Sequence, residues 1–213
     1  PGEAVGLLGP NGAGKTTSFY TVVGIVQPDR GEVFLNGKAL KGRPIHERAR
    51  AGIGYLPQET SVFRKLTVQE NLKLVLEFQN MSAAEQKAQI DRLLEEFGLT
   101  RLRHTPAIQL SGGERRRVEI ARAIAANPTY LLLDEPFTGI DPIAIQDIQR
   151  LISLLRDRGL GVLLTDHNPK ATLAIVDRAY IVHDGKLIFS GTNEEVARDP
   201  VVQLNYLGKD FQL

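Results

Sequence analysis

The chain carries the stretch Gly9-Pro10-Asn11-Gly12-Ala13-Gly14-Lys15-Thr16-Thr17 near its N-terminus. It fits the pattern Gly, four residues, Gly-Lys-Thr, which is typical of a phosphate-binding P-loop. An apolar run ending at Leu8 predicts a strand before it, and residues 16–26 predict a helix after it. The alternative, a glycine-rich turn with an incidental lysine, does not explain why strand, loop and helix follow in the required order.

The residue types of this stretch suit a nucleotide. Glycines accept positive φ angles, so their N–H groups can turn towards an anion, and the start of a helix adds partial positive charge. We expect all nine residues of the stretch to surround the phosphates of ATP. Lys15 would reach the β- and γ-phosphates, and the Thr16 hydroxyl would ligate Mg²⁺.

Composition limits the remaining possibilities. With 213 residues, the chain has room for one large domain or a domain with a lobe. Twenty-six Lys and Arg against 25 Asp and Glu argue against a strongly basic nucleic-acid binder. The absence of cysteine excludes disulfides and thiolate metal sites. No apolar run is long enough to cross a bilayer, so any membrane role is expected to come through a partner.

Apolar runs and turn signals predict an α/β fold. Continuous apolar runs at residues 130–134 and 161–165 predict strands buried on both faces, as in a parallel sheet. A shorter strand is expected at 53–56. Asn-Gly at 36–37 and Asp-Gly at 184–185 predict hairpins, and hence a small antiparallel part. We therefore predict a P-loop NTPase with a mainly parallel core.

Residues 67–127 carry helix signals and no strand signal. Thr67 with Glu70 and Ser82 with Glu85 form predicted capping boxes. We expect an α/β body at 1–58 and 128–213 and an inserted all-helical subdomain at 59–127. Further helices are predicted at 143–156, 168–176 and 194–206, and a short one at 44–50.

Two sets of residues outside the P-loop indicate chemistry. Asp134 and Glu135 close the apolar strand at 130–134, where Asp134 would hold Mg²⁺ and Glu135 would act as general base or orient the attacking water. Ser111, Gly112 and Gly113 precede a strong helix-forming stretch. Ser111 is expected to cap that helix, and the glycines would expose N–H groups to a second anion.

With the P-loop, the stretch Leu110-Ser111-Gly112-Gly113-Glu114 makes the sequence resemble the ABC-type ATPases, the nucleotide-binding subunits of transporters. The resemblance implies that two copies pack head to tail, so that Ser111, Gly112 and Gly113 of one close over ATP held by Lys15 of the other. It implies that Gln58 contacts Mg²⁺ and faces the transmembrane partner, that Asp141 belongs to a loop crossing the dimer interface, and that His167 contacts the γ-phosphate.

Further stretches, including residues 54–68, 113–122 and the ending Tyr206-Leu207-Gly208-Lys209-Asp210-Phe211, resemble the lipopolysaccharide-export branch of that family. The resemblance implies a subunit on the cytoplasmic face of the inner membrane. Branched-chain amino-acid importers remain an alternative. ABC-type ATPases acting on nucleic acid are disfavoured, because there is no sustained heptad run and no room for two such domains. The family stacks adenine on an aromatic residue upstream of the P-loop, and this chain starts too close to the P-loop to contain it. We therefore expect the natural N-terminus to lie before Pro1.

Residues 59–66 form a predicted loop between Gln58 and the helical subdomain. They place Val62 and Phe63 beside Arg64 and Lys65, without helical or strand alternation. A surface loop with Phe63 tucked against the lobe would explain this pattern. An apolar anchor with a basic rim, docking a short helix of a membrane subunit near Phe63 and Arg64, would explain it too.

Overall fold

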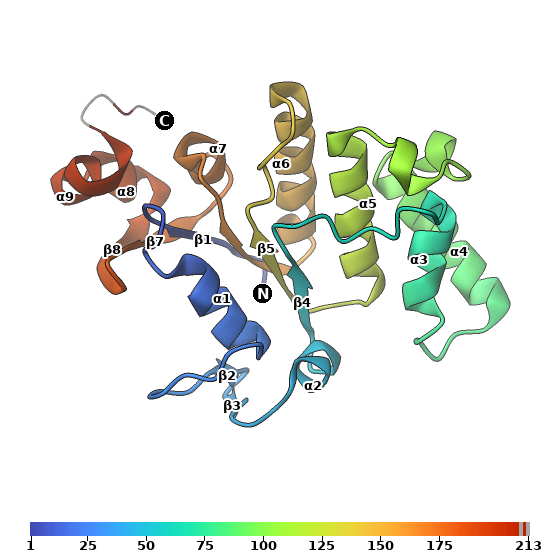
Figure 1. Ribbon diagram of the computed structural model, residues 1–213, viewed down its shortest axis with the longest axis horizontal. Helices are drawn as coiled ribbons and strands as arrows, with labels where there is room; N and C mark the ends of the chain where they lie inside the picture. Colours follow the sequence, from blue (N-terminus) through green and yellow to red (C-terminus); the bar gives the residue numbers. More distant parts are fainter. Residues whose placement is uncertain (209–210, 212–213) are drawn as a thin grey trace.

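The computed structural model describes residues 1–208 and 211, and its central feature is a six-stranded sheet flanked by helices (Figure 1). The strand order is β4-β5-β6-β1-β7-β8, with all neighbours parallel except the antiparallel pair β7 and β8. The strands are β1 (Ala4–Leu8), β4 (Ile53–Leu56), β5 (Tyr130–Asp134), β6 (Gly161–Thr165), β7 (Arg178–His183) and β8 (Lys186–Thr192). The predicted mainly parallel core is confirmed.

Two hairpins provide the antiparallel part. One joins β2 (Phe34–Leu35) to β3 (Lys38–Ala39), and the other joins β7 to β8. In both turns the two central residues have positive φ, at 50° and 76° for Asn36 and Gly37. This is the type I′ geometry that such dipeptides favour. The hairpin predicted at Asn36-Gly37 is short, because only residues 34–35 pair with residues 38–39.

Helices surround the sheet, and two groups of them lie at opposite ends of the molecule. Figure 1 shows α3, α4 and α5 at one end of the molecule and α8 and α9 at the other. The helices are α1 (Lys15–Val23), α2 (Ile45–Arg50), α3 (Val68–Leu76), α4 (Ala83–Glu96), α5 (Gly112–Ala125), α6 (Pro142–Asp157), α7 (Pro169–Leu173), α8 (Asn193–Arg198) and α9 (Pro200–Val202), with 3₁₀ turns Thr100–Leu102 and Ala107–Gln109 and a π-helical turn Gln203–Leu207.

Capping boxes begin each helix of the α3–α5 group. Side-chain hydrogen bonds pair Thr67 with Glu70, Ser82 with Glu85 and Ser111 with the backbone of residue 114. Each such cap contributes roughly 0.5–2 kcal/mol. The apolar faces of α3 and α4 are buried, and one continuous apolar cluster joins them to α5, α6 and the sheet. The sheet edge and the start of α5 are therefore packed on a common core.

Three predicted helices end or break earlier than expected. α1 stops at Val23 because Gly24 adopts a left-handed conformation with φ 91°, which leaves Ile25 outside the helix and half exposed. α7 stops at Leu173, since the chain must turn to reach β7 through buried residues 175–176. The predicted helix at 194–206 is interrupted at Asp199, which is extended before a proline, as residues preceding proline prefer.

The loop at residues 59–66 differs in one respect from the expectation. Val62 is buried in the main core, at 7% exposure, and is not presented to solvent. Phe63 is half exposed. The C-terminal stretch used for the closer resemblance falls partly outside the described residues, since Lys209 and Asp210 are not among them.

Candidate functional site

The loop between β1 and α1 wraps tightly against the sheet. A Cβ on Gly9 would lie 2.0 Å from the Val182 carbonyl oxygen, so only glycine fits there. Gly14 caps α1 in a left-handed conformation with φ 98°. The sequence-predicted strand–loop–helix arrangement is present, with the N–H groups of the first turn of α1 at the end of the loop.

Lys15 spans this loop. Its Nζ donates to the carbonyl oxygens of Gly9 and Pro10, at 2.8 and 2.9 Å. The side chain is 6% exposed, and burial lowers the pKa of the ammonium, although Glu135 and Asp134 partly offset this effect. A buried cation is thereby held beside two carboxylates at the carboxyl edge of the sheet.

Asp134 ends β5 and is almost fully buried, at 1% exposure. Its Oδ2 accepts a hydrogen bond from the Tyr55 hydroxyl at 3.3 Å, whereas Oδ1 has no hydrogen-bond partner among the described residues. Burial raises the pKa of this carboxyl group, with Glu135 adding to the effect. A carboxylate with a free buried oxygen is available to a cation.

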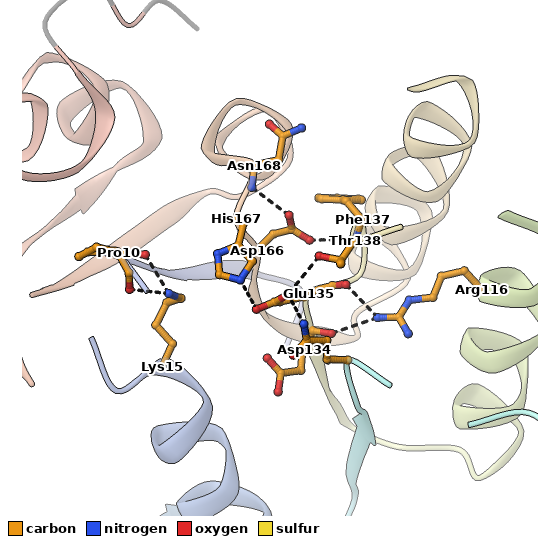
Figure 2. Close-up of polar contacts among 12 residues, drawn as sticks. Pro10, Lys15, Arg116, Asp134, Glu135, Phe137, Thr138, Asp166, His167 and Asn168 are labelled. Carbon is orange, nitrogen blue, oxygen red and sulfur yellow. Dashed lines mark hydrogen bonds and ion pairs between the residues drawn. The ribbon is translucent and has the colours of Figure 1, made fainter. Parts of the chain in front are cut away.

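Glu135 stands at the centre of the polar network in Figure 2. Its Oε2 accepts from Gln58 Nε2 at 2.7 Å and from the Thr138 hydroxyl at 3.1 Å. Its Oε1 lies 2.5 Å from His167 Nε2. The backbone of Glu135 is left-handed, with φ 48°, a conformation that non-glycine residues seldom adopt and that often marks functional turns.

The topology explains why these side chains meet. Gln58, Glu135 and His167 follow β4, β5 and β6, three neighbouring parallel strands whose carboxyl ends share one edge of the sheet. Ligands of open α/β sheets bind outside this edge. A cavity of about 340 Å³ opens there, lined by Gln58, Glu135, His167 and residues Asn11, Gly12, Ala13, Gly14, Lys15, Thr16 and Thr17.

The second set of predicted site residues lies elsewhere. Ser111 and Gly112 are exposed at the start of α5, where Ser111 forms the predicted cap. A Cβ on Gly113 would lie 2.6 Å from Ala144 Cβ at the start of α6, which Asp141 caps. None of these residues lines the P-loop cavity. The chain therefore offers a second helix start to an anion, apart from the first.

Three functional neighbours escaped the sequence reasoning. Thr138 and Tyr55 hydrogen bond to the carboxylates, and Arg116 donates to the carbonyl oxygens of residues 57, 134, 135 and 136 while pairing with Glu119. Helical periodicity could have placed Arg116 on the inner face of α5. Only the fold reveals that this face meets the turn after β5.

The family model of the ABC transporter matches residues 1–138. The chain is 57% identical to the lipopolysaccharide export system ATP-binding protein LptB of Acidithiobacillus ferridurans, over 100% of this chain and 88% of the relative. It is 57% identical to LptB of Escherichia coli K12 with the same coverage, and 54% identical to a probable ABC transporter ATP-binding protein of Azorhizobium caulinodans, over 100% of this chain and 75% of the relative.

Solved structures share the fold. An ATP-binding cassette of an ABC transporter in its ADP conformation superposes with a TM-score of 0.85 and 28% identity, covering 98% of this chain and 89% of that one. A dimeric cassette in a post-hydrolysis state, bound to ADP and Pi, gives a TM-score of 0.79 and 28% identity, with 90% and 86% covered.

No helix among residues 1–208 combines the length and apolarity needed to span a membrane. In the same part of the chain, no three His, Asp or Glu side chains gather as a metal-holding cluster. A cation at Asp134 would consequently need ligands from elsewhere.

Proposed function

This chain belongs to the ABC transporter family of ATP-binding proteins, and we propose that the ATP it hydrolyses drives the export of lipopolysaccharide. Identity of 57% over the whole chain to lipopolysaccharide-export ATP-binding proteins of two organisms carries this proposal. Such a subunit would sit on the cytoplasmic face of the inner membrane and be held there by transmembrane partners. No nucleic acid takes part.

The cavity residues divide the work of ATP hydrolysis. Lys15 and the N–H groups of the loop bind the phosphates and offset their charge. On binding, the Lys15 ammonium exchanges the Gly9 and Pro10 carbonyl oxygens for phosphate oxygens. Glu135 holds the attacking water and accepts its proton, while His167, whose Nε2 faces Glu135, donates towards the γ-phosphate. We expect Gln58 to link the state of the nucleotide site to the transmembrane partner, since its side chain donates a hydrogen bond to Glu135.

A magnesium ion fits the residues at this site. When bound, it supplies charge stabilisation on the β- and γ-phosphate oxygens. Thr16 and Gln58 line the cavity, and the unpartnered Oδ1 of Asp134 is an acceptor of the hard-oxygen type that this cation prefers. One carboxylate is enough, because magnesium ordinarily takes much of its remaining shell from substrate phosphates and water.

A second copy of the chain completes the nucleotide site in this proposal. Ser111, Gly112 and Gly113 are held away from Lys15 of their own chain, and their helix start faces solvent. Head-to-tail packing would bring them over ATP bound at the partner's loop, with Asp141 and its neighbours at the interface. A related cassette has been solved as a dimer with ADP and Pi, which supports the arrangement.

Docking to the membrane subunits would use the loop at residues 59–66. Phe63 is half exposed, and the Arg122 guanidinium lies 5.2 Å from the centre of its ring. Buried Asn71 fixes the loop, accepting from the Phe63 N–H and donating to its carbonyl oxygen. Arg64 is exposed beside it. A pre-organised aromatic with a basic rim is the kind of anchor that dominates protein interfaces.

Genetic complementation tests the proposed cargo. A Gram-negative strain depleted of its own lipopolysaccharide-export ATPase would receive the full-length protein or its Lys15→Ala variant, both at matched levels. We expect the parent to restore growth and surface lipopolysaccharide and the variant to fail. Absence of rescue by a folded parent protein that hydrolyses ATP and assembles with the export subunits would overturn the assignment.

A further inference from the structure

Asp166 is a buried carboxylate that the proposed chemistry does not use. Its side chain is 2% exposed, and burial raises its pKa. Both of its oxygens accept backbone hydrogen bonds: Oδ2 from the Phe137 N–H at 2.8 Å and Oδ1 from the Asn168 N–H at 2.9 Å. A buried carboxylate without a salt bridge is costly, so its two backbone partners are what hold it there.

These two bonds join the turn after β5 to the turn after β6. Figure 2 shows Asp166 between Phe137 on one side and Asn168 on the other, with Glu135 and His167 beside it. Glu135 precedes Phe137 by two residues, and His167 lies between Asp166 and Asn168. The carboxylate thus fixes both turns that place Glu135 and His167 at the cavity, although it does not line the cavity itself.

The turn after β5 contains a strained residue that hydrogen bonds must hold in place. Glu135 has φ 48°, a strained conformation that persists only when its surroundings enforce it. Its N–H donates to the Thr165 carbonyl oxygen at 2.8 Å, and the Thr138 hydroxyl donates to its side chain. Thr138 follows Phe137 directly, so the bond from Phe137 to Asp166 sets where that hydroxyl lies.

We infer that Asp166 is a positioning residue for ATP hydrolysis: by holding the Phe137 and Asn168 N–H groups, it fixes the strained turn of Glu135 and the place of His167. The inference rests on the proposed roles of those two residues. It assigns Asp166 no contact with ATP, so its loss should slow turnover and leave ATP binding by the loop intact.

The chain supplies a matched control. Both oxygens of Asp166 accept a backbone N–H. In Asp166→Asn one of them becomes an amide nitrogen, which is a donor and cannot accept, so one buried hydrogen bond to the backbone is lost. Asp177 Oδ2 likewise accepts a backbone N–H, from Ala4 at 2.8 Å, but at the start of β1, away from the P-loop. Asp177 is exposed and also pairs with Arg156, so Asp177→Asn controls for neutralising a carboxylate that holds a backbone N–H, though not for its burial, without touching the turns of Glu135 and His167.

Steady-state kinetics and melting temperatures compare the two variants in the assembled transporter. Misplacement of catalytic groups costs up to about a hundredfold. We expect Asp166→Asn to lower kcat about tenfold or more with the KM for ATP changed less than about twofold, and Asp177→Asn to keep the parental kcat. If Asp166→Asn does not fold, Asp166→Ser, whose side chain is small and neutral, replaces it, and we expect the same fall in kcat. Parental kcat in a folded Asp166 variant would overturn the inference.

A double-mutant cycle shows whether Asp166 acts through Glu135. If it does, adding Asp166→Asn to Glu135→Gln should slow turnover little further. Independent, multiplying losses would contradict the inference even if both single variants are slow. Failure of the proposed role of Glu135 is distinguishable, because Glu135→Gln alone would then turn over as fast as the parent, whatever Asp166→Asn does; the proposed cargo is tested separately by complementation.

Discussion

The carboxyl edge of the sheet and the start of α5 each expose the N–H groups of a helix start, but only the sheet edge also holds a buried cation, carboxylates and a histidine. At the sheet edge, buried Lys15 lies beside two carboxylates, and Glu135 already pairs with His167. At α5, Ser111 and Gly112 are exposed and bring no charge of their own beyond the capping carboxylate of Glu114.

This difference separates two half-sites on one chain. The sheet edge combines a buried cation, two buried carboxylates and the P-loop cavity. The start of α5 adds N–H donors and a hydroxyl, and its Arg115 guanidinium donates to the Leu110 carbonyl oxygen beside them. In the head-to-tail dimer that we propose, closure around ATP would require another copy to supply the missing half.

If the sheet edge is the chemical half, the largest effect should come from Glu135. Glu135→Gln keeps the size of the side chain but removes the base, so we expect turnover to fall about 10²–10⁴-fold while ATP still binds. Lys15→Ala, by contrast, should lose ATP binding itself. Measuring ATP affinity and turnover for both variants in the assembled transporter separates the roles, and unchanged turnover of Glu135→Gln would remove it from the mechanism.

A smaller effect is expected at the docking loop, residues 59–66, because none of its residues lines the P-loop cavity. Phe63→Ala should weaken assembly with the membrane subunits at least about tenfold, the size typical of an aromatic anchor, with ATP affinity of the isolated subunit unchanged. Phe78→Ala is the matched control, because Phe78 is 87% exposed between α3 and α4. Quantitative pull-down decides the outcome: equal assembly of the two variants would contradict docking at Phe63.

The smallest effect concerns the stability of the sheet edge without nucleotide. Because the pKa of Asp134 is raised, its ionised form disfavours the folded state at neutral pH. Asp134→Asn should therefore increase the free energy of unfolding, by about 1 kcal/mol, while lowering activity.

Chemical denaturation across pH checks the sign of this effect. The stabilisation should shrink as pH falls through the raised pKa of Asp134 in the folded state, and it should be lost by about pH 4, the ordinary Asp pKa, below which the parental carboxyl is protonated in both states. If Asp134→Asn were less stable than its parent at pH 7, interactions in the folded state would more than offset the cost of burying the ionised Asp134 carboxylate.

Local chemistry made much of this fold predictable from sequence. The capping boxes at Thr67 and Ser82, the Asn36-Gly37 and Asp184-Gly185 turns, and the buried run of β5 all depend on neighbours close in the chain. The end of α1 at Gly24 was missed, although glycine at that position is a common stop signal.

The rest depends on contacts between distant segments. The sequence predicts that Val62 is exposed beside Phe63, but Val62 is buried in the main core. The roles of Thr138 and Arg116 appear only when β5, α5 and the following turn are packed together. The left-handed backbone of Glu135 carries no local signal, because glutamate seldom adopts it.

The complementary half-sites are tested most directly by counting ATP bound to covalently linked dimers in the Glu135→Gln background. One dimer carries Lys15→Ala in one subunit and Ser111→Arg in the other, and its counterpart carries both changes in the same subunit. If Ser111 acts on the partner's nucleotide, the first dimer keeps one complete site and should retain ATP at one site, whereas the second should retain none. The reverse result, with ATP retained only when both changes share a subunit, would show that each chain closes its own site and would contradict the account.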